Sequence, residues 1–250
     1  MTRTVLILAP HPDDESITGL LALRLKEECG FRIWVVPATL GSRADRRTAR
    51  AKELRAACRV LGFHLRIPMA IPDGVASMKQ LLDIVADVSP AIVFMPHAKD
   101  GHPTHRACHW MGVAAMDAAR RIKAFHVVET EYWHPLERPN LMVAATKTHV
   151  ATLRRALACH AGEVARNDYA ARLPAWMSDN VRRGAELVGG PGAAAPNMAY
   201  ATLYRARIRA GGKWSAPFHG GKSLKSACDL RDWVAAWDAP PAAGASGPGR

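Results

Sequence analysis

Residues 4–16 read TVLILAPHPDDES, and they suggest both a fold and a first candidate site. The first six residues form a short, continuous apolar run, as expected for a strand that is buried on both faces of a sheet. This run passes directly into His11, Pro12, Asp13 and Asp14. A buried strand that ends in a histidine and acids predicts either an ordinary polar turn or a site that holds something positively charged.

The alternation of a strand with a helix continues along the chain. We predict strands at residues 4–9, 32–41, 63–68, 91–96 and 124–133, and helices at residues 16–30, 43–62, 78–88, 103–121 and 148–173. Ser16 would cap the first helix, and Gly30 and Gly62 would end two of them. This alternation indicates an α/β fold with a mostly parallel sheet and helices on both faces. We expect a single domain at residues 1–237, and a disordered tail at 238–250, where Pro, Gly and Ala are frequent.

Two polar loops should meet at one edge of this sheet. The segment PHPDD (10–14) follows the first predicted strand, and PHAKDGH (96–102) follows the strand at 91–96. In open sheets of this kind, ligands bind outside the carboxyl ends of the strands. The two loops therefore predict a shared site on that rim.

The side chains of these loops suit a divalent metal. A catalytic metal takes imidazole and carboxylate ligands and keeps one position open. His11 and Asp14 come from one tight turn, and His105 would lie in the first turn of a helix that begins near Pro103. Taken alone, the acids could simply favour a helix N-terminus, and single histidines are often structural. That interpretation does not explain why a histidine-rich helix start recurs on the same rim.

Two further residues have positions suited to catalysis beside the predicted metal. Asp13 lies between two ligands in sequence but projects differently, so it could accept a proton from a metal-activated water. His102 lies just before the second helix. It could act as a general acid or polarise the oxygen under attack.

Composition limits the classes of partner and compartment. The net charge is +12, but the basic residues are spread without a block of five like charges. We therefore expect no nucleic-acid partner, and an anionic metabolite or lipid headgroup fits better. The five cysteines are scattered without a C-x-x-C pair, which favours a reducing compartment. The N-terminal apolar run is too short for a signal peptide or a spanning helix, so we expect a soluble, cytoplasmic protein without stable membrane insertion.

At this point the residues resemble the PIG-L or LmbE-like family of zinc-dependent N-deacetylases. The resemblance runs in order over roughly residues 4–205 and includes VLILAPHPDDES, ATLGSRADRRTARAKELRAACRVLGF, IPDG and SPAIVFMPHAKDGHPTHRA. It implies a Rossmann-like fold. It also implies an enzyme that removes the N-acetyl group from a small-molecule amino sugar conjugate of the N-acetylglucosamine type.

The resemblance also implies a role for each matching residue. It implies that His11, Asp14 and His105 bind Zn²⁺, that Asp13 is the general base, and that His102 is the general acid or oxyanion partner. Arg50 and Asp73 match positions that contact the sugar in relatives. Fe²⁺ accepts the same ligand set, so the physiological metal stays open.

Two departures from the family pattern bear on these roles. Thr104 replaces an aspartate of the usual His-Pro-Asp-His pattern, and HAGE at 160–163 stands where relatives often have His-x-Ser-Gln. A carboxylate at position 104 would support a protonated His102. We therefore expect that His102 titrates lower than in relatives, or that Asp100 substitutes for the missing acid.

Two other function classes stay open. The first is a metal-dependent hydrolase of another bond, such as a different amide, an ester or a phosphoester. The second is a catalytically silent module that binds a sugar or nucleotide. A dinucleotide binder should carry G-x-G-x-x-G after its first strand, whereas PHPDDES is acidic and lacks glycine. The particular amino sugar and the oligomeric state cannot be read from the sequence.

Overall fold

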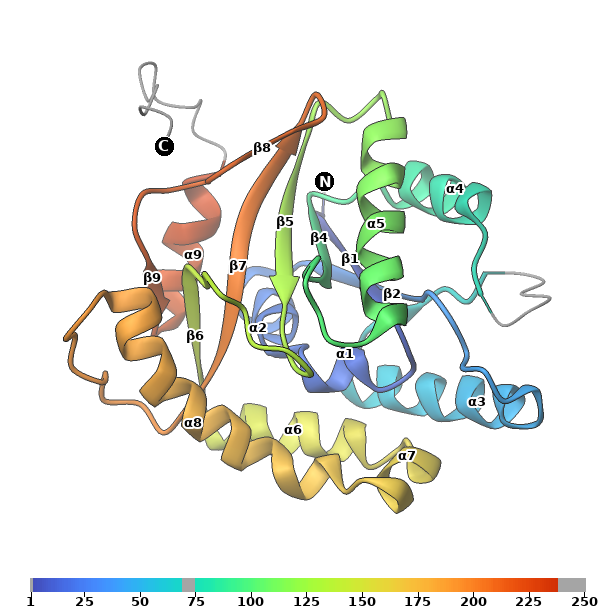
Figure 1. Cartoon of the computed structure of the whole chain (residues 1–250), viewed down its shortest axis with the longest axis horizontal. Helices are drawn as coiled ribbons and strands as arrows, with labels where there is room; N and C mark the ends of the chain where they lie inside the picture. Colours follow the sequence, from blue (N-terminus) through green and yellow to red (C-terminus); the bar gives the residue numbers. More distant parts are fainter. Residues whose placement is uncertain (1, 69–74, 238–250) are drawn as a thin grey trace.

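A computed structural model describes residues 2–68 and 75–237 of the chain. Its nine strands form one sheet, in the order β3-β2-β1-β4-β5-β7-β6-β9, with β8 paired to β7 (Figure 1). The strands are β1 (Thr4–Ala9), β2 (Arg32–Pro37), β3 (His64–Leu65), β4 (Ile92–Pro96), β5 (Ala124–Thr130), β6 (Leu141–Ala145), β7 (Tyr200–Ala210), β8 (Lys213–Ser215) and β9 (Lys222–Leu224). The predicted α/β class is confirmed.

Helices cover both faces of the sheet, as the sequence predicts. They are α1 (Asp14–Ile17), α2 (Leu20–Cys29), α3 (Ala44–Leu61), α4 (Met78–Val88), α5 (Pro103–Ala118), α6 (Lys147–Leu157), α7 (Ala161–Arg166), α8 (Tyr169–Gly189) and α9 (Ala227–Ala235). Side chains alternate across β1. Leu6 and Leu8 join the core beneath α4 and α5, whereas Val5 and Ile7 join the core beneath α2, α3 and α6. This alternation explains the continuous apolar run, because both faces of β1 are buried.

The first five strands are parallel, and the rest of the sheet is mixed. Pairings β2–β1, β1–β4, β4–β5 and β2–β3 are all parallel. Strand β7 then runs antiparallel to both β5 and β6, and β9 is parallel to β6. Sequence analysis predicted no strand after residue 133, so it missed this half. In β7 a local signal was present, because Arg205, Arg207 and Arg209 stand at every second position, the alternation typical of a strand with one solvated face.

Several predicted boundaries are wrong. Residues 148–173 do not form one helical stretch, because α6 ends at Leu157 and α8 begins anew after Asp168, whose side chain accepts from the Ala171 amide. The predicted helix at 16–30 is broken at Thr18 and Gly19. A Cβ atom at Gly19 would lie 2.1 Å from the Glu15 carbonyl oxygen, so only glycine allows this approach.

Other predicted boundaries are confirmed only in part. The strands predicted at 32–41, 63–68 and 124–133 are shorter in the structure, and Ser16 lies inside α1 rather than at its cap. Gly30 and Gly62 end α2 and α3 in the left-handed conformation, as predicted. The tail predicted at 238–250 lies outside the described residues.

Candidate functional site

The first candidate loop turns sharply where β1 ends. The side chain of Asp14 accepts a hydrogen bond from the His11 backbone N–H, with an N···Oδ2 distance of 2.8 Å. Asp13 precedes α1 with a φ of 121°. Positive φ is uncommon outside glycine and costs on the order of 1–3 kcal/mol, so the surrounding contacts must hold this residue in place. Asp13 and Asp14 are both buried despite their charge.

The second loop places His102 and His105 at the start of α5. Pro103 occupies the first turn, as predicted, and His102 is the N-cap residue. Asp100 braces both histidines: Oδ1 accepts from the His102 backbone N–H at 2.8 Å, and Oδ2 lies 3.2 Å from His105 Nδ1. The Asp100 side chain therefore contacts the His105 ring, whereas its bond to His102 is made through the backbone.

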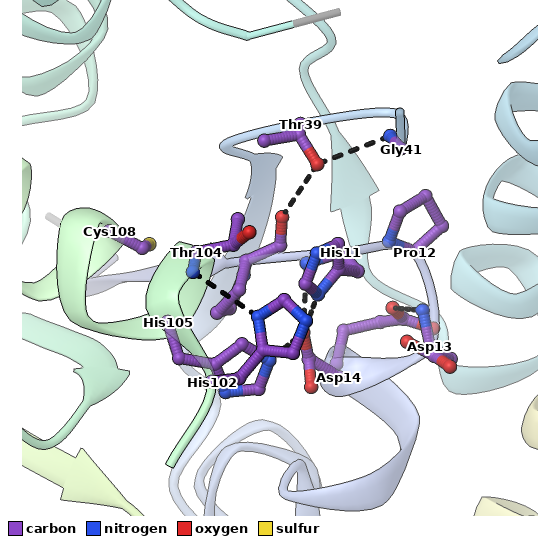
Figure 2. Close-up of polar contacts among 12 residues, drawn as sticks. His11, Pro12, Asp13, Asp14, Thr39, Gly41, His102, Thr104, His105 and Cys108 are labelled. Carbon is purple, nitrogen blue, oxygen red and sulfur yellow. Dashed lines mark hydrogen bonds and ion pairs between the residues drawn. The ribbon is translucent and has the colours of Figure 1, made fainter. Parts of the chain in front are cut away.

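The two loops bring four predicted site residues together. The rings of His11, His102 and His105 face one another, with ligand atoms all within 4.8 Å (Figure 2). The Asp14 Oδ2 atom lies 3.6 Å from His105 Nε2 and 3.7 Å from His11 Nδ1. Sequence analysis predicted His11, Asp14 and His105 as ligands. The structure adds His102 to the same cluster.

The cluster fits a divalent cation. His105 Nε2 is buried and has no hydrogen-bond partner, although a buried polar atom normally has one. Its other ring nitrogen, Nδ1, faces the Asp100 carboxylate. In a neutral ring this contact keeps the proton on Nδ1 and leaves the Nε2 lone pair available, as in the carboxylate–histidine–metal arrangement.

His102 differs from His105 in its hydrogen bonding. Its Nδ1 atom accepts from the Thr104 backbone N–H at 3.2 Å. A neutral His102 ring therefore carries its proton on Nε2. To bind a metal through Nε2 it would need the proton on Nδ1, where it would oppose the Thr104 donor. This pattern favours a proton or hydrogen-bond donor role for His102 over a role as a metal ligand through Nε2.

Burial and neighbouring charges shift the pKa values of the cluster in opposite directions. Burial raises the pKa of Asp13 well above its usual range, and the charges of Asp14 and Glu15 add to this effect. Burial alone would raise the pKa of Asp14 too, but His105 and His11 outweigh it and lower that pKa. Two adjacent carboxyl groups thus differ: Asp14 favours the anionic ligand form, and Asp13 has a greater affinity for a proton.

The histidines show a similar contrast. Burial would lower the pKa of His105, but the carboxylates of Asp14 and Asp100 outweigh it and raise that pKa. Burial lowers the pKa of His102, and the neighbouring His11 and His105 add to that shift. Of these two rings, His105 therefore has the higher affinity for a proton.

An open cavity of about 740 Å³ lies over the cluster. The predicted residues His11, Asp13, Asp14, Arg50 and His102 line it. Further lining residues include Thr39, Trp133, Glu163, Arg166 and Tyr169. This volume accommodates a sugar with an attached group, because small-molecule sites commonly measure about 300–1,000 Å³.

Arg50 belongs to the wall of this cavity, as its predicted sugar contact requires. Its Nη2 atom donates to the Pro12 carbonyl at 3.1 Å and lies 3.5 Å from Glu163 Oε1. A Cβ atom at Gly41 would lie 2.3 Å from Arg50 Nη1, and Gly41 has a φ of 94°. The positive φ therefore favours glycine at position 41, and a side chain there would also displace the Arg50 guanidinium. The other predicted sugar contact, Asp73, lies outside the described residues.

Sequence analysis missed residues that reach the site from later in the chain. The sequence patterns assign no chemical role to Glu15 or His160, yet their side chains meet 2.8 Å apart with no exposure to solvent. Trp133, Glu163 and Tyr169 were not assigned to the site. Glu15 belongs to the acidic run after β1, and this run was a local sign that it could lie at the site. The residues from later in the chain reach the site only through the packing of strands and helices, which no local pattern shows.

Comparison with protein-family models gives a match over the part of the chain that carries both loops. Residues 6–116 match the PIG-L family model, which is described as GlcNAc-PI de-N-acetylase. The matched PIG-L segment contains all five predicted metal and catalytic residues, from His11 to His105.

The curated relatives of this chain include two bacterial deacetylases. The probable N-acetyl-alpha-D-glucosaminyl L-malate deacetylase 2 of Bacillus cereus is 31% identical over 144 residues, covering 49% of this chain and 63% of that protein. The 1D-myo-inositol 2-acetamido-2-deoxy-alpha-D-glucopyranoside deacetylase of Acidothermus cellulolyticus is 28% identical over 163 residues, covering 49% and 56%. The chain thus spans about three-fifths of the length of these relatives.

Solved structures share the fold over a larger part of the chain. The N,N'-diacetylchitobiose deacetylase from Pyrococcus horikoshii has a TM-score of 0.60 at 17% identity and covers 84% of each chain. GalB, the 4-carboxy-2-hydroxymuconate hydratase from Pseudomonas putida KT2440, has a TM-score of 0.63 at 21% identity and covers 82% of this chain and 96% of its own. The same fold thus includes a deacetylase and a hydratase, so function must be argued from the site.

Among residues 2–68 and 75–237, no helix combines the length and the apolar character needed to cross a bilayer.

Proposed function

We propose that this chain is a metal-dependent N-deacetylase that removes the acetyl group from a small-molecule amino sugar conjugate. The observation that carries the proposal is the orphaned, buried Nε2 atom of His105, which lies close to Asp14 and His11, two residues that line the open cavity. The family match and the two curated relatives support the same reaction class.

His11, Asp14 and His105 would hold the metal. Zn²⁺ is the proposed ion, and Fe²⁺ suits the same two-histidine, one-carboxylate set. When bound, such an ion supplies Lewis acidity, which lowers the pKa of water and polarises the amide carbonyl. The Asp100 carboxylate would keep His105 in the tautomer that binds through Nε2.

Asp13 is the proposed general base. It lines the cavity beside the ligands, and its raised pKa increases its capacity to take a proton from the attacking water. Amide hydrolysis then requires a donor for the developing oxyanion and a proton for the leaving amine. His102 Nε2–H can serve either need, because its Nδ1 is occupied by the Thr104 N–H.

The substrate would place its amide over the cluster and its sugar against the wall. Arg50 is the proposed sugar contact within the described residues, and Asp73 is retained from the sequence as a second one. A conjugated group would occupy the remaining cavity toward Trp133 and Tyr169. Aromatic faces suit the apolar side of a sugar or its attached group.

A screen of acetate release tests the proposal. The panel would contain N-acetylglucosaminyl conjugates of L-malate and myo-inositol together with N,N'-diacetylchitobiose. We expect acetate from at least one member, loss of release with a chelator, and recovery when zinc is restored. Failure of the zinc-loaded protein to release acetate from every member, together with hydration of a muconate or cleavage of a phosphoester, would replace the proposal with that other activity.

An Asp13→Asn variant tests the base in the same assay. We expect full zinc binding and a fall in kcat of about 10²–10⁴-fold, the usual contribution of a general base. The matched control is Asp117→Asn, which removes a carboxylate near the far end of α5 that pairs with Arg209. Wild-type turnover in Asp13→Asn would remove Asp13 from this role.

A further inference from the structure

The peptide bond between Pro12 and Asp13 is held from both sides. Its carbonyl oxygen accepts from Arg50 Nη2 at 3.1 Å, and its N–H donates to Glu15 Oε2 at 2.9 Å. This peptide leads into the unusual backbone of Asp13, with its φ of 121°. Because a non-glycine residue does not favour that region, the orientation of the Asp13 carboxylate depends on what fixes the peptide plane.

Both braces are themselves anchored on one short helix. His160, the N-cap residue of α7, places Nε2 2.8 Å from Glu15 Oε1. Glu163, in the first turn of α7, places Oε1 3.5 Å from Arg50 Nη2. Residues about 150 positions beyond the first loop in sequence therefore contact both side chains that bond to its Pro12–Asp13 peptide.

We propose that His160 and Glu163 form a clamp that fixes the Pro12–Asp13 peptide and thereby aims the Asp13 carboxylate at the reacting atoms. The clamp rests on the proposed function, because Asp13 is the general base there. His160 and Glu163 are positioning residues that act through Glu15 and Arg50. Catalytic groups must be held close to their productive geometry by a rigid surrounding, and this clamp supplies it on the Asp13 side.

A purely structural role for α7 accounts less well for these contacts. None of the six residues of α7 is buried, so the helix adds no buried apolar side chain to the core. The His160–Glu15 contact is instead a fully buried polar pair. Replacing such a pair by apolar groups is often neutral or stabilising, so a buried pair is weak evidence for stability. The contact instead fixes Glu15, whose other carboxylate oxygen accepts a hydrogen bond from the Asp13 N–H.

The test compares two substitutions of His160 with a matched control. His160→Leu removes the donor to Glu15, whereas His160→Gln retains an amide N–H of similar reach. The control is His149→Gln, since His149 forms another histidine–glutamate pair, 3.5 Å from Glu27, away from the cavity. Glutamine at that position also suits the helix start, where His149 forms a capping box with Thr146.

We expect His160→Leu to lower kcat about 10- to 100-fold, less than the loss of the base itself. KM and zinc content should stay within about twofold of wild type, because the cavity and the ligands are unchanged. His160→Gln should recover most of kcat, and His149→Gln should match the wild type. If His160→Leu does not fold, Glu163→Gln replaces it, with a smaller fall in kcat expected because the Arg50 contact is longer.

Several results would overturn the clamp. One is a wild-type kcat in His160→Leu; another is a parallel loss of zinc and kcat in both His160 variants, which would indicate a structural role. A crystal structure of His160→Leu adds a readout that needs no activity: the clamp predicts a rotated Pro12–Asp13 peptide, and an unchanged Asp13 φ contradicts it. If the wild type releases no acetate from any conjugate, the proposed function fails, while this structural readout still decides whether the clamp exists.

Discussion

The Asp100→Asn substitution isolates what one carboxylate does for the metal centre. Asp100 makes two bonds with two oxygens: one accepts the His102 backbone N–H at 2.8 Å, and the other faces His105 Nδ1 at 3.2 Å. Asparagine has one oxygen and one NH₂ group in the same space. If its oxygen serves the His102 N–H, the NH₂ group faces His105 Nδ1 and drives the ring proton to Nε2.

Either orientation of the amide carries a cost. With the NH₂ group toward His105 Nδ1, the ring proton moves to Nε2 and blocks the lone pair that would bind the metal. The alternative orientation satisfies His105 but leaves the NH₂ group opposing the His102 N–H, and an unmade buried hydrogen bond costs about 1–3 kcal/mol. Losing the partner of a metal-binding histidine typically weakens metal affinity about 10- to 100-fold. We therefore expect the zinc Kd of Asp100→Asn to rise by that factor, or about 1.4–2.8 kcal/mol.

Competition with a chromophoric chelator at neutral pH measures this change directly. Asp117→Asn is the control, because it removes an exposed carboxylate from the same helix and leaves the cluster intact. The zinc Kd of the control should equal that of the wild type. An Asp100→Asn protein that binds zinc within about twofold of the wild type would refute the assignment of Asp100 and the tautomer argument for His105.

Three further predictions follow from the same contacts. Replacing His105 by Gln should reduce bound zinc from about one per chain to near zero, and retained stoichiometric zinc by mass spectrometry would exclude His105 as a ligand. Gly41→Ala should lower the Tm by about 2–8 °C and reduce activity, since an L residue at positive φ costs about 1–2 kcal/mol and its Cβ would meet Arg50; an unchanged Tm in calorimetry would count against this packing. Thr104→Asp should raise the pKa of His102, because a nearby carboxylate favours the charged ring, so the basic limb of the pH–rate profile should move to higher pH; an unmoved limb would mean that His102 is not the acid.

The two loops of the proposed metal site were predictable because each is marked by a pattern of neighbouring residues. A buried strand, a tight turn and a helix start are each visible within about ten residues, and the carboxyl-edge rule then joins the first loop to the second. His11, Asp14, His102 and His105 meet in the structure as this reasoning expects. The role of Asp100 could be only half anticipated, because the sequence could not tell which histidine its carboxylate would face.

The later part of the chain was not predictable in the same way. The antiparallel strands β6 and β7 depend on pairing between segments about 60 residues apart, which no local pattern encodes. The His160–Glu15 contact spans 145 positions and required the placement of α7 against the metal loop. His160 matches the first residue of the His-x-Ser-Gln pattern, but nothing near it in sequence identifies Glu15 as its partner.

The central claim, that this cluster performs metal-dependent deacetylation, is tested most directly by titrating zinc into metal-stripped protein while acetate release is measured. The account predicts no release without metal, and a linear rise that reaches its maximum at about one zinc per chain, as expected for a single site with three protein ligands. Undiminished release from the metal-stripped protein, or no release from any conjugate with the site filled, would contradict it.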